Sequence, residues 1–557
     1  MKLLFISLFL LQVWRVNSEE AKQPPHIILI YADDFGWNDV SFHGSPEIPT
    51  PNIDALAMSG ITLHTYYGEA TCTPSRAALM SGKYPMRLGL QHYVSMAGQR
   101  SGLPLDVTTL PQHLKNLGYA THIVGKWHLG YHTTAHFPTN RGFDTFFGYM
   151  NGFIGYYDFT FYQPTKPKGW FGIDLYNGTQ PIKNFRAQYT PYVFADHAKD
   201  IILNHDSSKP MFLYIPQLAV HSGNEFQPHQ APPEKVAEFK WIKDVDRRIH
   251  AAVVSTLDDT VGTIFDALGE KDMLNNSIVL VVSDNGAEVL SSNTGAGSNY
   301  PLKGNKNTFW EGAIHVPAVI WSPLLNLDEP RVSNQLMHAT DWLPTLYSAA
   351  NGDPKDLGSI DGVDMWEALM NDLPSPRTQL LNNLDQVYGT SAFRMGDLKL
   401  VNGSNGLGYD TWYGPTGFEY YIPDESMYQW VFKRGSPVRD ILQKNGWWIV
   451  KDPDAQLYER AKVTCQQPPP EYASNCRADF KPCLFNITAD PCEYEDLAEQ
   501  HQDVVISMMQ SIEAYMRESL PPNSMDRDPW ANPLCHGFVY APWMDPGQSA
   551  DCDVFQK

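Results

Sequence analysis

Two apolar runs of the sequence are followed by side chains that could bind a metal ion. Asp33 and Asp34 come just after the run HIILIY, and Asp284 and Asn285 come just after SIVLVV. These side chains offer only carboxylate and amide oxygens, a donor set that suits Ca²⁺ or Mg²⁺ and disfavours zinc. Either pair alone could serve as turn or helix-cap residues. Two such pairs, each at the end of an apolar run, favour a metal site.

A cysteine stands at the expected start of a helix. Cys72 opens the stretch CTPSR, which Thr73 is predicted to cap, with Pro74 at the first helical position and Gly82 beyond the last turn. The positive end of a helix favours an anion, so it would activate the thiol as a nucleophile. The alternative is a structural or unpaired thiol.

Three further polar residues follow apolar runs. Lys126 and His128 come after THIV, and His221 follows MFLYI across a short loop. Ligands of open parallel sheets bind beyond the carboxyl ends of the strands, so these residues could share one site with the carboxylates. Taken singly, a lysine is usually solvated and a histidine is usually a core residue.

The elements that would position these residues alternate along the chain. The expected strands are His26–Tyr31, Thr121–Val124, Met211–Ile215 and Ser277–Val282, and the expected helices are Thr50–Ser59, Leu110–Leu117 and Arg248–Leu268. Alternating strands and helices predict an α/β fold with a largely parallel sheet that helices cover on both faces. We therefore predict a catalytic domain over residues 19–376.

The composition changes after about Pro376. A stretch rich in Gly, Tyr and Asn is followed by a Pro-rich, cysteine-bearing stretch and by an amphipathic helix over Leu497–Met516. This pattern predicts a smaller α+β domain over residues 377–557, held by disulfides. Six of the seven cysteines fall there, at Cys465, Cys476, Cys483, Cys492, Cys535 and Cys552. Six cysteines allow 15 pairings, among which the sequence does not choose.

The chain begins like a secreted protein. Residues 1–18 combine a basic start, an apolar run and a small-residue cleavage site, which predicts a signal peptide. No later apolar run is long enough to span a bilayer. The chain has four glycosylation sequons, at Asn177, Asn275, Asn402 and Asn486. We expect a soluble product of the secretory pathway, either lysosomal or extracellular.

The charge balance narrows the partners. The 557 residues carry 41 basic and 62 acidic side chains, a formal net charge of −21. This argues against nucleic acid as a partner, but a small anionic substrate needs only a local positive site. Hydrophobic content of 43% and aromatic content of 12% exclude a mainly disordered chain.

Several blocks together resemble the sulfatase family. The stretch CTPSR, continued by SGKYP, resembles the sulfatase signature Cys-x-Pro-x-Arg. The blocks ADDFGW, GKWHLG, SDNG and PLKG with WEG occur in the family's order within residues 26–345. The resemblance is strongest to the arylsulfatase B, or N-acetylgalactosamine-4-sulfatase, group.

This resemblance implies an alkaline-phosphatase-like fold and a modified cysteine. A formylglycine-generating enzyme would oxidise Cys72 to Cα-formylglycine, whose hydrate attacks sulfur and later expels inorganic sulfate. One Ca²⁺ would be held by the acids and the amide named above together with the modified cysteine. The implied ligands are thus Asp33, Asp34, Cys72, Asp284 and Asn285.

The same resemblance assigns roles to the basic residues. Arg76 would hold the formylglycine hydroxyl, and Lys126 and Lys303 would bind sulfate oxygens. His128 would be the base that triggers sulfate release, and His221 would contact the sulfate or protonate the leaving oxygen. The loop after His221 lacks the proline that usually follows in the family, which leaves the local conformation open.

The sequence therefore predicts a Ca²⁺-dependent sulfatase of the arylsulfatase type that acts on a sulfate monoester. The alternatives are a phosphoesterase of the same superfold and a secreted binding protein without catalysis. The substrate stays open between a sulfated glycosaminoglycan and a small sulfate ester. The aromatic-rich segment Tyr149–Trp170 could form a wall that stacks on a sugar, or part of the core.

Overall fold

A ten-stranded mixed sheet forms the centre of the molecule. The computed structural model describes residues 23–165, 168–184, 187–289, 295–416, 431, 435–450, 456–465, 476–546 and 552, so the predicted signal peptide lies outside the described residues. The strand order is β13-β2-β12-β11-β1-β10-β4-β5-β8-β9. In that order the strands are Arg331–Ser333, Ile61–Leu63, Ala318–Trp321, Ser277–Ser283, His26–Ala32, Met211–Pro216, Ala120–Lys126, Thr145–Tyr149, Tyr176–Asn177 and Gln180–Pro181.

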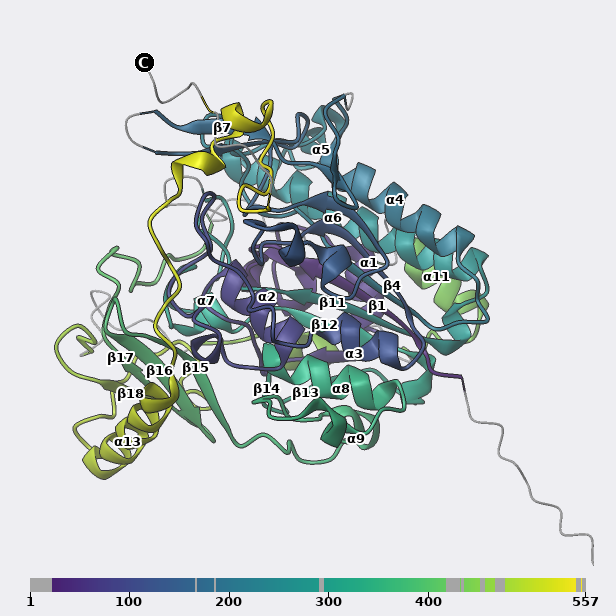
Figure 1. The fold of residues 1–557 in the computed structure, drawn as a ribbon. Helices are drawn as coiled ribbons and strands as arrows, with labels where there is room; N and C mark the ends of the chain where they lie inside the picture. The colour runs from purple at the N-terminus through teal and green to yellow at the C-terminus, as the bar shows by residue number, and fades with distance from the viewer. Residues whose placement is uncertain are drawn as a thin grey trace, which may run out of the picture.

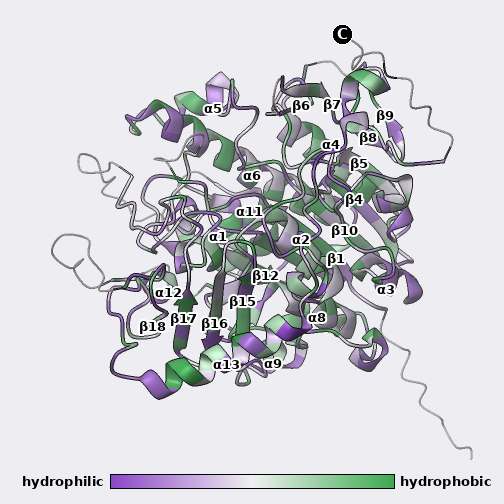
Figure 2. Cartoon of the chain, turned by 60° about the vertical axis from the view of Figure 1, so that its left-hand side comes forward, coloured by the Kyte–Doolittle hydropathy of each residue, from purple (hydrophilic) through white to green (hydrophobic). Residues whose placement is uncertain are grey.

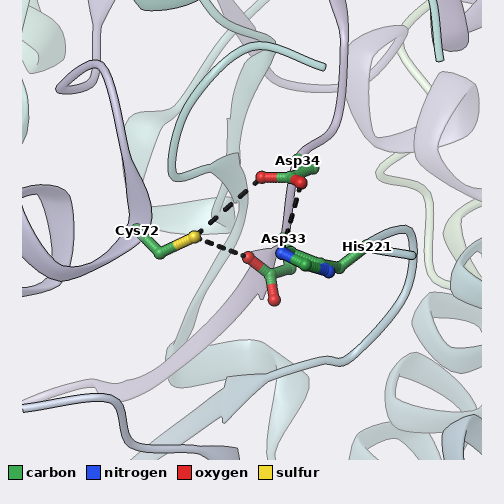
Figure 3. Close-up of side chains that lie close together, drawn as sticks. All are labelled: Asp33, Asp34, Cys72 and His221. Carbon is green, nitrogen blue, oxygen red and sulfur yellow. Dashed lines mark hydrogen bonds and ion pairs between the residues drawn. The ribbon is translucent and has the colours of Figure 1, made fainter. Parts of the chain in front are cut away.

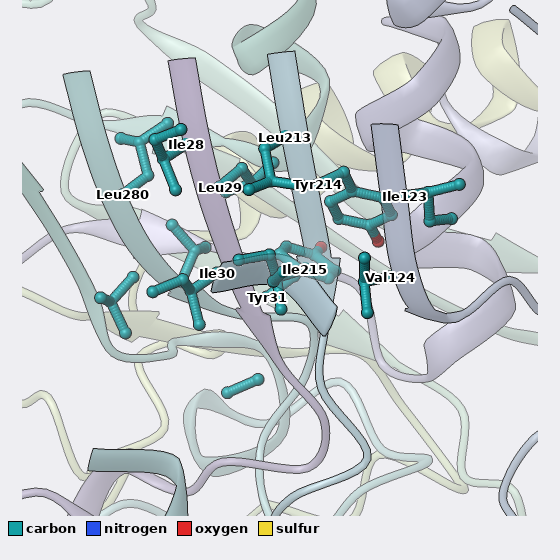
Figure 4. Close-up of a cluster of buried hydrophobic side chains, with 14 of the residues drawn as sticks. Ile28, Leu29, Ile30, Tyr31, Ile123, Val124, Leu213, Tyr214, Ile215 and Leu280 are labelled. Carbon is teal, nitrogen blue, oxygen red and sulfur yellow. The ribbon is translucent and has the colours of Figure 1, made fainter. Parts of the chain in front are cut away.

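The middle of the sheet is parallel and buried on both faces. Strands β11, β1, β10, β4 and β5 run in one direction, and the strands that flank this group, β12 and β8, run antiparallel to it. Every residue of β1, β10 and β11 is buried, as expected of a parallel sheet that helices cover on both faces. Figure 4 shows Leu29 and Ile30 of β1 packed among side chains of β10, β4 and β11. The four predicted strands are confirmed, with ends one or two residues longer.

Two helical layers enclose this sheet (Figure 1). One layer consists of α1 (Pro51–Ala57), α4 (Thr190–Asn204), α6 (Val245–Glu270) and α11 (Pro437–Lys444). The other contains α2 (Cys72–Ser81), α3 (Leu110–Asn116), α8 (Trp342–Ala349) and α9 (Trp366–Asn371). Figure 2 shows hydrophobic residues gathered along the central strands between these layers. The predicted fold class is therefore confirmed.

A second, antiparallel sheet packs beside the first. Its strands are β15 (Gln379–Asp385), β16 (Thr390–Met395), β17 (Leu398–Asn402) and β18 (Cys483–Asn486), and α13 (Gln502–Glu518) packs against it. A fully buried ion pair joins the two parts, because Lys399 of β17 contacts Glu311 at 2.8 Å, and Lys399 also contacts Glu493 of its own part at 2.9 Å. A domain boundary at residue 376 falls just before β15 and stays a prediction.

The chain after α13 returns to the large sheet. We call residues 519–546 the C-terminal strap; in Figure 1 it is the yellow chain that runs from α13 to the neighbourhood of β7 (Trp170–Ile173). Its backbone N–H groups donate to carbonyls in the part of the chain that contains the ten-stranded sheet, from Asn523 to Gly89 at 2.8 Å and from Asp528 to Gly98 at 2.7 Å. Helix α11 also packs on the large sheet's layer, so the range 377–557 is not confined to the smaller sheet.

The cysteines that the sequence left unassigned form three disulfides. They join Cys465 to Cys492, Cys476 to Cys483 and Cys535 to Cys552. Cys72 is a free, buried thiol. Of the sequon asparagines, Asn177 and Asn275 are exposed, and Asn402 and Asn486 are half-buried. Among the described residues, no helix combines the length and hydropathy that a membrane crossing requires.

Candidate active site

The carboxyl ends of β1, β11 and β4 bring buried acids and a lysine together. Ala32 pairs with Ser283 in the register of β1 and β11, so the residues that follow both strands are neighbours. The Asp34 backbone N–H donates to Asp284 Oδ1 at 3.1 Å. The structure therefore brings these polar side chains together at one edge of the sheet, as predicted.

Helix α2 presents the free thiol to these carboxylates (Figure 3). The Cys72 sulfur lies 3.5 Å from Asp33 Oδ1 and 4.0 Å from Asp34 Oδ1, and the residue is 1% exposed. Burial alone would raise the pKa of this thiol, but the ammonium groups of Lys126 and Lys306 lower it from 9.0 to about 6. Cys72 is thus an activated, buried group rather than a disulfide partner.

The start of α2 differs from the predicted cap. The helix begins at Cys72 with Thr71 as N-cap, so the prediction of Thr73 as N-cap was wrong by two residues. The Thr73 hydroxyl donates instead to the His128 carbonyl at 3.2 Å. The Ser75 hydroxyl donates to the Asp284 carbonyl at 2.5 Å, which fixes the helix against the loop after β11. Gly82 caps the helix with φ +65°, as predicted.

Each carboxylate at the floor of the site has a basic partner. Lys126 Nζ lies 2.8 Å from Asp33, and Arg76 Nη2 lies 2.7 Å from Asp284 and 3.3 Å from Asp33. Arg76 and Lys126 are fully buried. Buried charges need such partners, because the loss of hydration costs several kcal/mol per ion. Arg76 thereby compensates the charge of two acids that are candidate metal ligands.

The lysine expected at the sulfate was placed wrongly by sequence. Lys303 Nζ lies 3.3 Å from the centroid of the Trp310 ring and 4.5 Å from that of Trp412, and burial lowers its pKa to about 8. Lys306 contacts Asp34 instead, at 2.6 Å. Both lysines belong to one loop, in which Gly304 turns the backbone with φ +96°. Because both residues are lysines, residue type alone could not predict which of them contacts the carboxylates.

His221 lies beside Asp34 and Lys306. Its Nε2 is 3.4 Å from Asp34 Oδ2 and 3.2 Å from Lys306 Nζ, and its ring stacks on Phe153. Burial lowers the pKa of His221, but the Asp34 and Asp33 carboxylates and the hydrogen bond with Cys72 together raise it more, so the net shift is upward. The Tyr156 hydroxyl donates to the His221 carbonyl at 2.7 Å and thereby holds the loop that lacks the family's proline.

His128 has the opposite electrostatic setting. Burial, together with the charges of Lys126 and Arg76, holds its pKa well below the usual value, so the ring is neutral. Its Nε2 lies 2.9 Å from the Ser95 carbonyl, which makes Nε2 the protonated nitrogen. Its Nδ1 is buried without a hydrogen-bond partner in the described part of the chain. A neutral imidazole with a free nitrogen can accept a proton.

The donor set fits a hard divalent cation. Asn285 Nδ2 donates to Asp34 at 2.7 Å, whereas Asn285 Oδ1 is buried and has no partner among the described residues. Burial, reinforced by the neighbouring Asp33 carboxylate, raises the pKa of Asp284. A cation bound by these oxygens would satisfy the amide and stabilise the ionised carboxylates. Ligand atoms of Asp33, Asp34, Cys72 and His221 also lie within 4.8 Å of one another.

A cavity of about 600 Å³ opens above the cysteine. Cys72, His128, His221 and Lys306 line it, and its volume lies within the range of ~300–1,000 Å³ typical of small-molecule sites. The aromatic-rich segment Tyr149–Trp170 contributes side chains both to the wall of this cavity and to the hydrophobic core. Phe153 and Phe161 line the cavity, whereas Tyr149, Tyr156 and Phe159 are buried in the core.

Comparison with known proteins identifies the class. The sequence model described as Sulfatase matches residues 25–352. Arylsulfatase J of Mus musculus is 37% identical over 524 residues, which cover 93% of this chain and 80% of that protein. N-acetylgalactosamine-6-sulfatase of Homo sapiens is 33% identical over 369 residues, which cover 64% of this chain and 67% of that protein.

Solved structures agree in fold. The chain superposes with a TM-score of 0.68 and 27% identity on "Crystal structure of Ps i-CgsB in complex with k-i-k-neocarrahexaose", covering 91% of this chain and 96% of that one. The fold and the site thus define a hydrolase of sulfate esters. The chain belongs to the sulfatase family, as its sequence blocks predicted.

Proposed function

We propose that this sulfatase hydrolyses a sulfate monoester carried by a sugar, with Cys72 converted to Cα-formylglycine and one Ca²⁺ bound. The observation that carries the proposal is the position of Cys72. Its sulfur lies 3.5 Å and 4.0 Å from two buried carboxylates, at a cavity of about 600 Å³. Two lysines that contact the same carboxylates could also bind sulfate oxygens.

The proposed groups supply the chemistry that this chain's side chains lack. Hydrated formylglycine would offer one hydroxyl as nucleophile and a second for release of the sulfate. The calcium ligands would be Asp33, Asp34, Asp284, Asn285 and the modified residue 72, and the ion would neutralise charge on the sulfate oxygens. The modified residue depends on maturation, for which a formylglycine-generating enzyme is the proposed partner.

The chain's own residues then orient the ester and move protons. Lys126 and Lys306 would bind sulfate oxygens, so Lys306 takes the role that the sequence gave to Lys303. Arg76, one helical turn after Cys72, holds Asp33 and Asp284 and would hold the nucleophile. Neutral His128 would accept a proton at Nδ1. His221, whose pKa is raised, would donate a proton to the leaving oxygen.

Two comparisons support a sugar as the leaving group. One relative is named N-acetylgalactosamine-6-sulfatase, and one structural neighbour holds a neocarrahexaose. We propose that the activity is of the arylsulfatase B-like type, with the glycosaminoglycan and small-ester alternatives to be separated by assay. The three disulfides and the exposed sequons support the secretory pathway, lysosomal or extracellular, as its location.

Replacement of Cys72 tests the proposal. Cys72→Ala is expected to abolish hydrolysis of 4-nitrophenyl sulfate while secretion and thermal unfolding stay unchanged. An aldehyde-specific hydrazide probe is expected to label the wild-type peptide that contains residue 72 and not the peptide from the variant. Undiminished activity in Cys72→Ala, or a thiol at position 72 in active enzyme from its native source, would overturn the mechanism.

A further inference from the structure

The C-terminal strap brings a cationic side chain to the cavity above Cys72. Arg527 lines this cavity together with Gln163 and Pro164, although it lies 455 positions after Cys72 in the sequence. The flanking backbone is fixed, since the N–H groups of Asn523 and Asp528 donate to the carbonyls of Gly89 and Gly98. Figure 1 shows the yellow strap crossing between the two parts of the molecule.

Arg527 has no carboxylate partner in the part of the chain that the structure describes. Its Nη1 donates to the Pro164 carbonyl at 2.8 Å, which orients the guanidinium. Of the two adjacent acids, Asp528 pairs with Arg100 at 2.8 Å, and Asp526 is exposed and forms no ion pair with Arg527 among the described residues. Nε and Nη2 of Arg527 therefore have no hydrogen-bond acceptor among the described residues.

An arginine in this position favours an anion. The guanidinium stays charged at any physiological pH, and its planar set of donors binds carboxylate or sulfate oxygens in pairs. Arg527 is half-buried, so part of its hydration is lost without a compensating charge. Two carboxylates also line the cavity, exposed Glu225 and half-buried Glu288, but neither forms an ion pair with Arg527 among the described residues.

The cavity has room for more than one sulfated ring. Its volume is about 600 Å³, and its lining includes Cys72 and Lys306 as well as Arg527 of the strap. Lys306 is engaged with Asp34 and belongs to the reacting end. Arg527 and Lys306 are the two Lys or Arg side chains among the residues that line this cavity.

We propose that Arg527 binds a second anionic group of the substrate, carried by the sugar next to the one that is desulfated. This inference rests on the proposed sulfatase function and deepens it, because it makes the substrate an oligosaccharide with at least two anionic groups. The second group is a carboxylate or a sulfate, which present the same paired oxygens to the guanidinium. Arg527 is then a specificity residue that acts on substrate affinity.

Four substrates separate the possibilities. They are 4-nitrophenyl sulfate and three sulfated disaccharides, whose second sugar is neutral, carries a carboxylate or carries a second sulfate. For Arg527→Gln, we expect KM to rise about 10- to 100-fold for the disaccharide with the preferred anion, as for loss of a hydrogen bond to a charged group. KM for 4-nitrophenyl sulfate and for the neutral disaccharide, and kcat for all four, should stay within twofold of wild type.

Two further variants control for charge and folding. Arg527→Lys keeps the charge and should recover part of the affinity. Arg477→Gln removes an exposed arginine that pairs with Asp479 and does not line the cavity, and it should leave every KM unchanged. Equal thermal unfolding of all variants shows that the strap is intact.

The outcomes are distinct. An equal rise in KM for all four substrates, an unchanged KM for both dianionic disaccharides, or failure of the wild type to hydrolyse either of them would overturn the proposal. Whether the carboxylate or the sulfate disaccharide responds identifies the bound group. Activity of Cys72→Ala on 4-nitrophenyl sulfate would instead refute the proposed function, independently of Arg527.

Discussion

The two lysines of the loop after β11 offer a direct test of the site. Lys306 contacts both oxygens of Asp34, at 2.6 Å and 2.7 Å, and lines the cavity. Lys303 lies against the ring of Trp310 and does not line the cavity. Replacement of each by methionine removes one ammonium group while keeping an unbranched side chain. The pair therefore compares the geometry with the sequence-based assignment.

The magnitude for Lys306→Met follows from burial and charge. Removal of one partner of a buried ion pair costs about 3–5 kcal/mol, because the remaining charge is left uncompensated. Asp34, at 3% exposure, would be left in that state, with His221 as its other close basic partner. Loss of one group that stabilises the developing charge typically costs about 2.7–4 kcal/mol, or 10²- to 10³-fold in kcat. We expect a fall in kcat of this order.

Lys303→Met should act on stability alone. Its ammonium group interacts with aromatic faces and is partly desolvated, as its lowered pKa of about 8 shows. A cation–π contact contributes about 0.5–2 kcal/mol, and methionine fills much of the same space. Thermal unfolding should shift slightly, whereas kcat per folded molecule should stay within about threefold of wild type.

The assay is steady-state hydrolysis of 4-nitrophenyl sulfate, normalised to the fraction of folded protein from circular dichroism. Lys306→Arg serves as a second variant that keeps the charge and should retain more activity than Lys306→Met. The reasoning would be refuted if Lys303→Met lost more than tenfold in kcat while Lys306→Met did not. An equal loss in both variants would refute it as well, because only one lysine contacts Asp34.

Two further predictions concern the cation and pH. Chelation of the cation with EGTA should lower Tm and raise KM, and excess Ca²⁺ should restore both values, since a ligand at 100 times its Kd stabilises the folded protein by about 2.7 kcal/mol. In the variant Asn285→Leu, EGTA should no longer change Tm. If EGTA left the Tm of the wild type unchanged, the proposed metal site would be contradicted. His43 stacks on Trp37, and burial holds its pKa well below 6.5 in the folded protein. As the pH falls, this histidine is therefore protonated in the unfolded chain before it is protonated in the folded protein. The free energy of unfolding should then decrease as the pH drops below about 6.5. Urea titrations should show that the free energy of unfolding drops between pH 7 and pH 5 by about 2 kcal/mol less in His43→Gln than in the wild type. Equal drops in the two proteins would contradict the role given to His43.

The central sheet and its acids could be predicted because local patterns determine them. The run HIILIY is too apolar for the surface, and its length suits a buried strand, so Asp33 and Asp34 had to lie at the strand's end. The same reasoning placed Asp284 and Asn285 after β11. Parallel pairing then brings these ends together without further information from the sequence.

Loop conformation and the route of the last segment could not be predicted. Lys303 and Lys306 differ in role because Gly304 turns the loop, and such turns depend on contacts from distant parts of the chain. Thr71 and Thr73 are equally good caps by residue type. The return of Arg527 to the cavity depends on backbone hydrogen bonds of the strap, such as that from Asn523 to Gly89, for which composition gives no signal.

The balance of charge at the floor of the site supports the proposal of a bound cation. The carboxylates of Asp33, Asp34 and Asp284 are matched in number by Arg76, Lys126 and Lys306, which form ion pairs with them. A floor with equal positive and negative charge gives little attraction to a sulfate monoester, which is itself an anion. A divalent cation on the carboxylate and amide oxygens would make the floor positive and would leave the lysines free to turn from the acids to the sulfate. Binding of metal and of substrate should therefore be coupled, which is why chelation is expected to raise KM and not only to lower Tm.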